Sequence, residues 1–132
     1  AVQLKHILIA DDEPHLLRVL RLGLEKAGYI VSAVTNGELA LAKFRETSPD
    51  VLITDIEMPR MNGEELCRSL EKENSNDNFL VVVVTSHPEE SHRAWSSRMP
   101  GIKFLEKPLS LRNLCNLLDA HFAASEGDDK DE

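Results

Sequence analysis

Three runs of apolar residues in this chain each end in a side chain that can do chemistry. The first run leads into Asp11 and Asp12, and the second leads into Asp55. The third run, which is rich in valine, leads into Thr85. If these runs are parallel strands of one open sheet, their carboxyl ends lie along the edge where such folds bind ligands. The sequence therefore predicts one site with three carboxylates and a hydroxyl.

Carboxylates gathered at one edge repel each other, and each raises the pKa of the others unless a cation lies between them. Mg²⁺ suits such a site, because it prefers oxygen ligands and is usually held by one or two carboxylates together with phosphate oxygens. We therefore predict Mg²⁺ as the cofactor, with Asp11, Asp12 and Asp55 as ligands. The alternative for Asp11 and Asp12 is that they cap the helix that follows and complement its dipole.

Lys107 and Thr85 extend the predicted site beyond the acids. Lys107 follows another short strand, and its ammonium could neutralise a phosphoryl oxygen. The Thr85 hydroxyl could donate a hydrogen bond to the same group. Each residue also has an ordinary explanation, since most lysines are solvated at the surface and threonine favours strands. Together, the acids, the hydroxyl and the ammonium are the parts that phosphoryl transfer to an aspartate needs.

Strands and helices must alternate along the chain to bring these residues to one edge. Strands are predicted at residues 6–10, 30–34, 51–55, 80–84 and 102–106. A segment with the length of an amphipathic helix follows each strand, although the segment at 88–95 is largely polar. This alternation predicts a parallel sheet covered by helices on both faces. The unbroken valine run is typical of a central strand that is buried on both sides.

Turn and cap residues mark the breaks between these elements. Pro14 can begin the first helix, because the first helical position needs no N–H group, and Gly28 ends that helix. Asn36 and Gly37 are predicted to form a turn before the second helix. Ser110 is predicted to cap the last helix.

The composition limits the partners that the chain can have. Its 132 residues suit one domain, and its formal net charge of −8 argues against a surface for nucleic acid or anionic membrane. No apolar stretch approaches the ~18 residues that span a bilayer, and the beginning of the chain lacks a signal-peptide pattern. Cys67 and Cys115 lack metal or redox spacing and are expected to be reduced thiols. We therefore expect a soluble, cytoplasmic protein.

The last residues differ in composition from the rest of the chain. Residues 1–124 are predicted to form the domain, whereas beyond Ala124 the chain turns acidic and loses apolar residues. Residues 125–132 are therefore predicted to be a disordered tail or the beginning of a linker. The sequence is compatible both with a stand-alone protein and with a domain cut from a longer chain.

From Lys5 to Phe122, the chain closely resembles the receiver domain of bacterial two-component response regulators. The motifs that carry this resemblance are Asp11-Asp12, Asp55 followed by residues 58–63 (MPRMNG), Thr85, and Lys107-Pro108. The resemblance implies a flavodoxin-like doubly wound α/β fold, a three-layer (βα)5 sandwich whose five-stranded parallel sheet has the order 2-1-3-4-5. It also implies a cis peptide between Lys107 and Pro108, a conformation that only a bond before proline reaches at low cost.

By this resemblance, Asp55 is the phosphoacceptor, which receives a phosphoryl group from a histidine kinase or a phosphotransfer protein. Thr85 and Lys107 would contact the phosphoryl oxygens. A receiver of this kind catalyses only its own phosphorylation and dephosphorylation, so we do not expect a turnover enzyme. It would be a monomer or a phosphorylation-dependent dimer.

The resemblance also assigns ligands to the metal and residues to the timing of the signal. Mg²⁺ would be held by Asp11, Asp12, Asp55 and the backbone carbonyl of Glu57. Glu57 and His87, two positions after Asp55 and Thr85, would tune the lifetime of the phosphoryl group by guiding or blocking an attacking water. From its polar neighbours, His87 is expected to lie exposed on a loop.

A switch is implied as well. Thr85 would move toward the phosphoryl group, and Phe104, three positions before Lys107, would rotate inward; Ser86 is small enough to leave room for the ring. Phe104 could instead be an ordinary core aromatic, and it lacks the hydroxyl with which a tyrosine would mark its outward state. The face formed by the fourth helix, fifth strand and fifth helix would then report phosphorylation to a downstream protein or an output domain.

Two alternatives come from other functional classes. An aspartyl-phosphate phosphatase would use Asp11 as its nucleophile, but such enzymes carry an Asp-x-Asp pattern, and Glu13 stands at the second position here. A phosphorylation-independent receiver-like interaction module would keep the fold without the chemistry. All five chemical positions are present in this chain, so the phosphoacceptor is favoured over that module.

Overall fold

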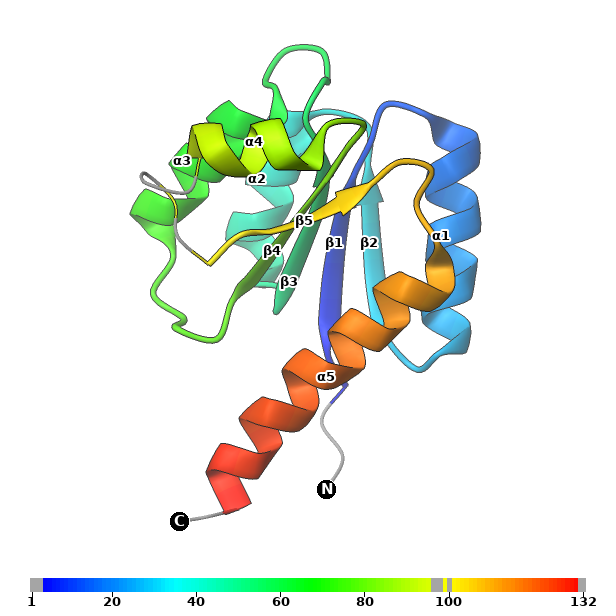
Figure 1. Cartoon of the computed structure of the whole chain (residues 1–132), viewed down its shortest axis with the longest axis vertical. Helices are drawn as coiled ribbons and strands as arrows, with labels where there is room; N and C mark the ends of the chain where they lie inside the picture. Colours follow the sequence, from blue (N-terminus) through cyan, green and yellow to red (C-terminus); the bar gives the residue numbers. More distant parts are fainter. Residues whose placement is uncertain (1–3, 96–98, 100, 131–132) are drawn as a thin grey trace.

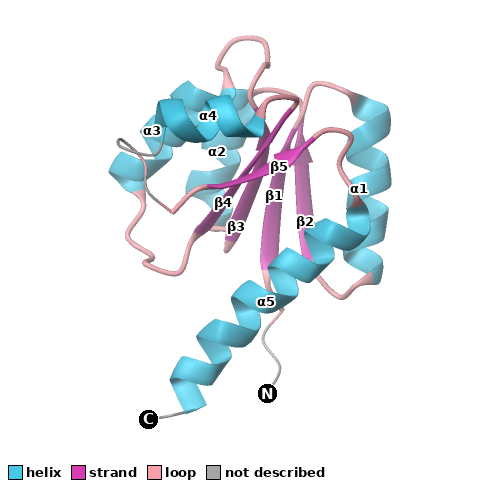
Figure 2. Cartoon of the chain, viewed as in Figure 1, coloured by secondary structure: helices cyan, strands magenta, loops and turns pink. Residues whose placement is uncertain are grey.

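The computed structural model of the protein describes residues 4–95, 99 and 101–130. Within these residues, five strands alternate with five helices (Figures 1 and 2). In chain order, the elements are β1 (His6–Ala10), α1 (Pro14–Lys26), β2 (Ile30–Val34), α2 (Gly37–Thr47), β3 (Val51–Asp55), α3 (Gly63–Glu73), β4 (Leu80–Thr85), α4 (Pro88–Trp95), β5 (Lys103–Glu106) and α5 (Leu111–Lys130). The predicted alternation of strand and helix is thereby confirmed.

The five strands form one parallel sheet in the order β2-β1-β3-β4-β5. This is the predicted order of a flavodoxin-like doubly wound fold. Figure 1 shows α1 and α5 on one face of the sheet and α2, α3 and α4 on the other, which gives three layers. Because Ala10 pairs with Thr54, Asp11 and Asp55 leave the ends of neighbouring strands at the same level.

Two apolar cores hold the helices to the two faces of the sheet. On one face, Ile7 and Ile9 of β1 pack in a cluster with leucines of α1 and α5. On the other face, Leu8 of β1 packs in a cluster with residues of α2, α3 and α4, including Phe44 and Leu66. Successive side chains of a strand point to opposite faces, so β1 is buried from both sides. These two cores make the central strands a rigid support for the residues at their carboxyl ends.

Helix α2 begins differently from the prediction. Asn36 does not form an isolated turn with Gly37; it is the N-cap of α2, and its side-chain oxygen accepts a hydrogen bond from the Leu39 N–H at 2.9 Å. Asparagine favours both turns and N-caps, so only the path of the following chain separates the two. Ser110 caps α5 as predicted, because its hydroxyl oxygen accepts the Asn113 N–H at 3.2 Å.

The C-terminal end of the described residues is helical. Helix α5 continues to Lys130, past Ala124, where the apolar residues stop. Helical hydrogen bonds propagate easily once a helix has formed, so a helix can continue past its last apolar residue. Among the helices that the structure describes, none combines the length and apolar character needed to cross a bilayer. Cys67 and Cys115 are free, in agreement with the prediction.

Candidate functional site

The three predicted acidic residues meet at the carboxyl edge of the sheet. Asp11 follows β1, and Asp55 is the last residue of β3; they are 6% and 7% exposed. Asp12 is exposed to solvent beside them. One carboxylate oxygen from each of the three lies within 4.8 Å of the others, so they form a group that could hold a metal ion. The structure therefore brings together the three carboxylates that the sequence analysis assigned to Mg²⁺.

Asp11 is fixed by backbone hydrogen bonds on both sides. Its N–H donates to the Val34 carbonyl of β2 at 3.1 Å, and its Oδ1 accepts the Glu13 N–H at 2.9 Å. Burial raises the pKa of the Asp11 carboxyl, the Glu13 N–H opposes that rise, and the charge of Asp55 adds to it. The N-cap of α1 is Glu13, whose side chain makes no capping bond. Asp11 thus points into the acidic group, which argues against the helix-capping alternative.

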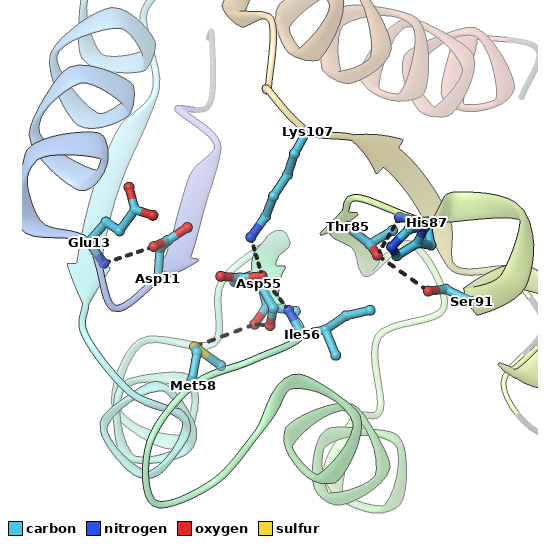
Figure 3. A network of polar contacts seen from close by, with 10 residues as sticks. Asp11, Glu13, Asp55, Ile56, Met58, Thr85, His87, Ser91 and Lys107 are labelled. Atoms are coloured by element: carbon cyan, nitrogen blue, oxygen red, sulfur yellow. Dashed lines mark hydrogen bonds and ion pairs between the residues drawn. The ribbon is translucent and has the colours of Figure 1, made fainter.

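Asp55 is held by one strong charged contact and one backbone contact. Figure 3 shows Lys107 reaching across to this carboxylate, with Nζ 2.8 Å from Oδ1. The same Oδ1 accepts the Ile56 N–H at 2.8 Å. Burial lowers the pKa of Lys107, but the hydrogen bond and the charge of Asp55 outweigh it and raise that pKa overall. Lys107 therefore places a fixed positive charge beside the Asp55 carboxylate.

The backbone of Asp55 is supported from behind by two residues to which the sequence analysis assigned no role, Thr54 and Gly63. The Thr54 hydroxyl, which is fully buried, donates to the Asp55 carbonyl at 2.9 Å. The Gly63 N–H donates to the Ile56 carbonyl at 2.7 Å. A Cβ at Gly63 would lie closer than 3.0 Å to the Asp55 carbonyl oxygen, so only glycine fits at the beginning of α3. The glycine after Asn62 was the sequence signal for this contact.

Thr85 ends β4 and is 7% exposed. Its Oγ1 accepts the His87 N–H at 3.1 Å and lies 3.5 Å from the hydroxyl of Ser91 on α4 (Figure 3). Its carbonyl accepts the Lys107 N–H at 2.9 Å, which ties β4 to the end of β5. Ser91 is a further residue that the sequence analysis missed, because a lone serine on a polar helix carries no pattern.

Phe104, which the sequence analysis assigned to the switch, lies against α4. Phe104 of β5 is half-buried, and its ring packs edge-on against Trp95 and His92 of α4, with centroids 5.6 and 5.8 Å away. Glu57 and His87 are both exposed, and His87 lies on a loop as predicted. The peptide bond between Lys107 and Pro108 is cis, which confirms the expectation drawn from the family resemblance.

A comparison with protein families identifies this arrangement. The family model described as the response regulator receiver domain matches residues 7–119, a range that contains the acidic group, Thr85, Phe104 and Lys107. The chain belongs to this family. The parallel five-stranded sheet of the receiver and the position of its site at the carboxyl edge agree with that membership.

Individual proteins resemble the receiver over most of its length. It is 34% identical to the protein PilH of Pseudomonas aeruginosa over 117 residues, which make up 89% of this chain and 97% of PilH. It is 30% identical over 110 residues to PhoP of Bacillus subtilis, an alkaline phosphatase synthesis transcriptional regulatory protein. That match covers 83% of this chain and 45% of PhoP, so the receiver spans less than half of that relative.

Solved structures resemble it in fold. A CheY-like response regulator receiver domain protein from Methanospirillum hungatei superimposes with a TM-score of 0.83 at 26% identity, covering 96% of this chain and 99% of that one. The chemotaxis response regulator CheY4 of Vibrio cholerae superimposes with a TM-score of 0.81 at 24% identity, covering 90% of this chain and 99% of that one.

Proposed function

We propose that this receiver accepts a phosphoryl group on Asp55, with Mg²⁺ beside it, from a histidine kinase or a phosphotransfer protein. The surroundings of the Asp55 carboxylate carry the proposal. Carboxylate oxygens of Asp11, Asp12 and Asp55 lie within 4.8 Å of one another, and Lys107 Nζ is 2.8 Å from Asp55 Oδ1. A buried carboxylate with acidic neighbours and a fixed cation combines a nucleophile with charge compensation.

Asp55 is the nucleophile in this proposal. One carboxylate oxygen attacks the phosphorus of a phosphohistidine, so that an O–P bond forms and the P–N bond to the imidazole breaks. Asp55 Oδ1 already accepts the Ile56 N–H and faces Lys107. We therefore assign the attack to Oδ2, which neither of these contacts occupies. Water later attacks the phosphorus of the acyl phosphate, which restores the carboxylate and releases phosphate.

Lys107 and Thr85 would stabilise the charge of the transferred group. The raised pKa of Lys107 keeps its ammonium charged, so it can pair with a phosphoryl oxygen. The Thr85 hydroxyl is nearly shielded from solvent, and a donor in such a place strengthens its interaction with developing charge. Behind them, the contact of Gly63 with the Asp55 backbone keeps the nucleophile in position.

The donor set fits Mg²⁺. Asp11, Asp12 and Asp55 would hold the ion together with the backbone carbonyl of Glu57, and carboxylate and carbonyl oxygens are the ligands that Mg²⁺ prefers. The raised pKa of the buried Asp11 carboxyl indicates a place that disfavours a negative charge without a cation. When bound, Mg²⁺ neutralises phosphoryl oxygens during transfer.

The receiver would act on itself and pass its state to another protein or to an output domain. PhoP, of which the receiver spans 45%, is by name a transcriptional regulatory protein, which supports an output located outside the matched region. The α4-β5-α5 face is the proposed reporting surface, because α4 contacts both Thr85 and Phe104. Amide shifts on addition of beryllofluoride should include this face, and a face left unchanged would refute the assignment.

The proposal is tested by intact mass after incubation with acetyl phosphate and Mg²⁺. The wild-type chain should gain one phosphoryl group, whereas Asp55→Ala and a sample with EDTA should gain none. Asp77→Asn, a change at an exposed aspartate outside the site, should behave as wild type. A gain that persists in Asp55→Ala would refute the assignment. If neither acetyl phosphate nor beryllofluoride changed the wild-type protein, the phosphorylation-independent interaction module would be the better description.

A further inference from the structure

Helix α4 contacts both residues of the proposed switch. Ser91, which is half-buried, has its hydroxyl oxygen 3.5 Å from Thr85 Oγ1. One turn further along the same helix, Trp95 packs edge-on against Phe104. Figure 3 shows Ser91 approaching Thr85 from α4, whereas Lys107 and Asp55 meet each other elsewhere in the site. The Thr85 side chain therefore has a partner on α4 that lies outside the acidic group.

The hydrogen bonds available to Thr85 give Ser91 a definite place. A threonine hydroxyl has one proton to donate and two lone pairs that accept. One lone pair of Thr85 Oγ1 accepts the His87 N–H at 3.1 Å. The Ser91 hydroxyl donates to the other lone pair at 3.5 Å, so the Thr85 oxygen accepts from Ser91 and from His87 on the α4 side.

We propose that Ser91 is a positioning residue, which holds the Thr85 hydroxyl on the α4 side while Asp55 is unphosphorylated. This inference rests on the proposed function of Asp55. To donate to a phosphoryl group on Asp55, the Thr85 hydroxyl must move toward that group, and it cannot do so while its oxygen stays beside the Ser91 hydroxyl on α4. The contact with Ser91 must therefore be given up in the phosphorylated state. Ser91 opposes the switch, and the loss of its hydroxyl makes the switch easier.

Trp95 provides a reporter on the same helix. It is the one tryptophan in the sequence, is 4% exposed, and lies against Phe104. Any displacement of α4 or Phe104 that accompanies a change at Thr85 alters the surroundings of the indole. Trp95 fluorescence, together with the amide shifts of α4, therefore follows the switch without an added label.

The experiment is a titration with beryllofluoride, a phosphoryl analogue, at a fixed Mg²⁺ concentration. Ser91→Ala removes one weak neutral hydrogen bond from the resting state. The beryllofluoride concentration that half-saturates this variant should therefore be about two- to fivefold lower than that of wild type. Ser91→Cys, which replaces the hydroxyl with a weakly hydrogen-bonding thiol, should change the half-saturating concentration in the same direction. Ser69→Ala, at a half-buried helical serine on α3, should match wild type. An unchanged or raised half-saturating concentration in Ser91→Ala and Ser91→Cys would overturn the proposal.

A double-mutant cycle tests whether Ser91 acts through Thr85. Thr85→Val keeps the shape of the side chain and removes its hydroxyl, so adding Ser91→Ala to that variant should change nothing further. A shift that persists in the valine background would mean that Ser91 acts through packing, which also overturns the proposal.

The same titration separates the two proposals. If wild type gave no saturable change, or if Asp55→Asn responded like wild type, the phosphoacceptor proposal would fail and the role of Ser91 would fail with it. If wild type responded, Asp55→Asn did not, and Ser91→Ala matched wild type, only the role of Ser91 would be refuted.

Discussion

The position of Gly63 predicts that one added methyl group disables the site without touching a catalytic side chain. A Cβ at this residue would lie 2.9 Å from the Ile56 Cα and 3.2 Å from the carbonyl carbon of Asp55, and closer than 3.0 Å to the Asp55 carbonyl oxygen. Ordinary van der Waals contact begins at 3.4 Å, so the backbone of β3 must shift by at least about 0.5 Å. Neighbouring backbone cannot rotate away as a side chain can.

Two quantities follow for Gly63→Ala. Overpacking of this kind costs about 1–3 kcal/mol, and the reduced freedom of the unfolded chain offsets about 0.4–1 kcal/mol of that. We therefore expect a net loss in the free energy of unfolding of up to about 2.6 kcal/mol, with a midpoint of about 1.3 kcal/mol, measured by urea denaturation. A misplacement near 1 Å costs about 100-fold in rate, so phosphorylation by acetyl phosphate should slow by at least about tenfold.

Gly23→Ala is the matched control. A Cβ at Gly23 also meets an atom closer than 3.0 Å, but that atom is the end of the Leu111 side chain, which can move. Alanine also gains about 1 kcal/mol over glycine inside a helix. Gly23→Ala should therefore stay within about 1 kcal/mol of wild type in stability and keep the wild-type rate of phosphorylation. If Gly63→Ala matched Gly23→Ala in both assays, the contact with Asp55 would not matter and the reasoning would be refuted.

Three further predictions concern charge at the site. The Lys107→Met variant lacks a cation that competes with Mg²⁺ for the acidic group. It should therefore bind Mg²⁺ more tightly in a calorimetric titration, yet gain the phosphoryl group more slowly. Weaker Mg²⁺ binding would contradict this. Burial raises the pKa of Asp11, so the folded chain holds this proton more tightly than the unfolded chain, and stability in EDTA should fall as pH rises through that pKa. In urea denaturation measured from acidic to neutral pH, the stability of Asp11→Asn should not show this fall. Saturating Mg²⁺ should restore the stability of wild type but not change that of the variant. Glu57→Ala should lose the phosphoryl group faster, because the negative charge of the exposed carboxylate no longer opposes the approach of the lone pair of the attacking water. An unchanged decay in the intact-mass assay would refute this role.

Several parts of the site could be predicted from the sequence because they depend on local pattern. The spacing of apolar residues and the length of each segment reveal strands and helices. Residues that follow parallel strands must then meet at one edge of the sheet. The types of Asp11, Asp55 and Lys107 then restrict the chemistry to acids and a cation. The same logic failed at Asn36, since a turn and an N-cap have the same residue preference and differ only in where the chain goes next.

What the sequence determined by itself, then, is the order of elements, the composition of the acidic edge and the kind of ligand that it can hold. What only the tertiary structure decided is which groups touch across elements. The approach of Gly63 to the Asp55 backbone and the contact of Ser91 with Thr85 each join two elements. Such contacts depend on how α3 and α4 are packed onto the sheet, and that packing results from the whole apolar core. A local pattern encodes which face of a helix is apolar, but not which atom of the polar face comes to rest beside a neighbouring hydroxyl.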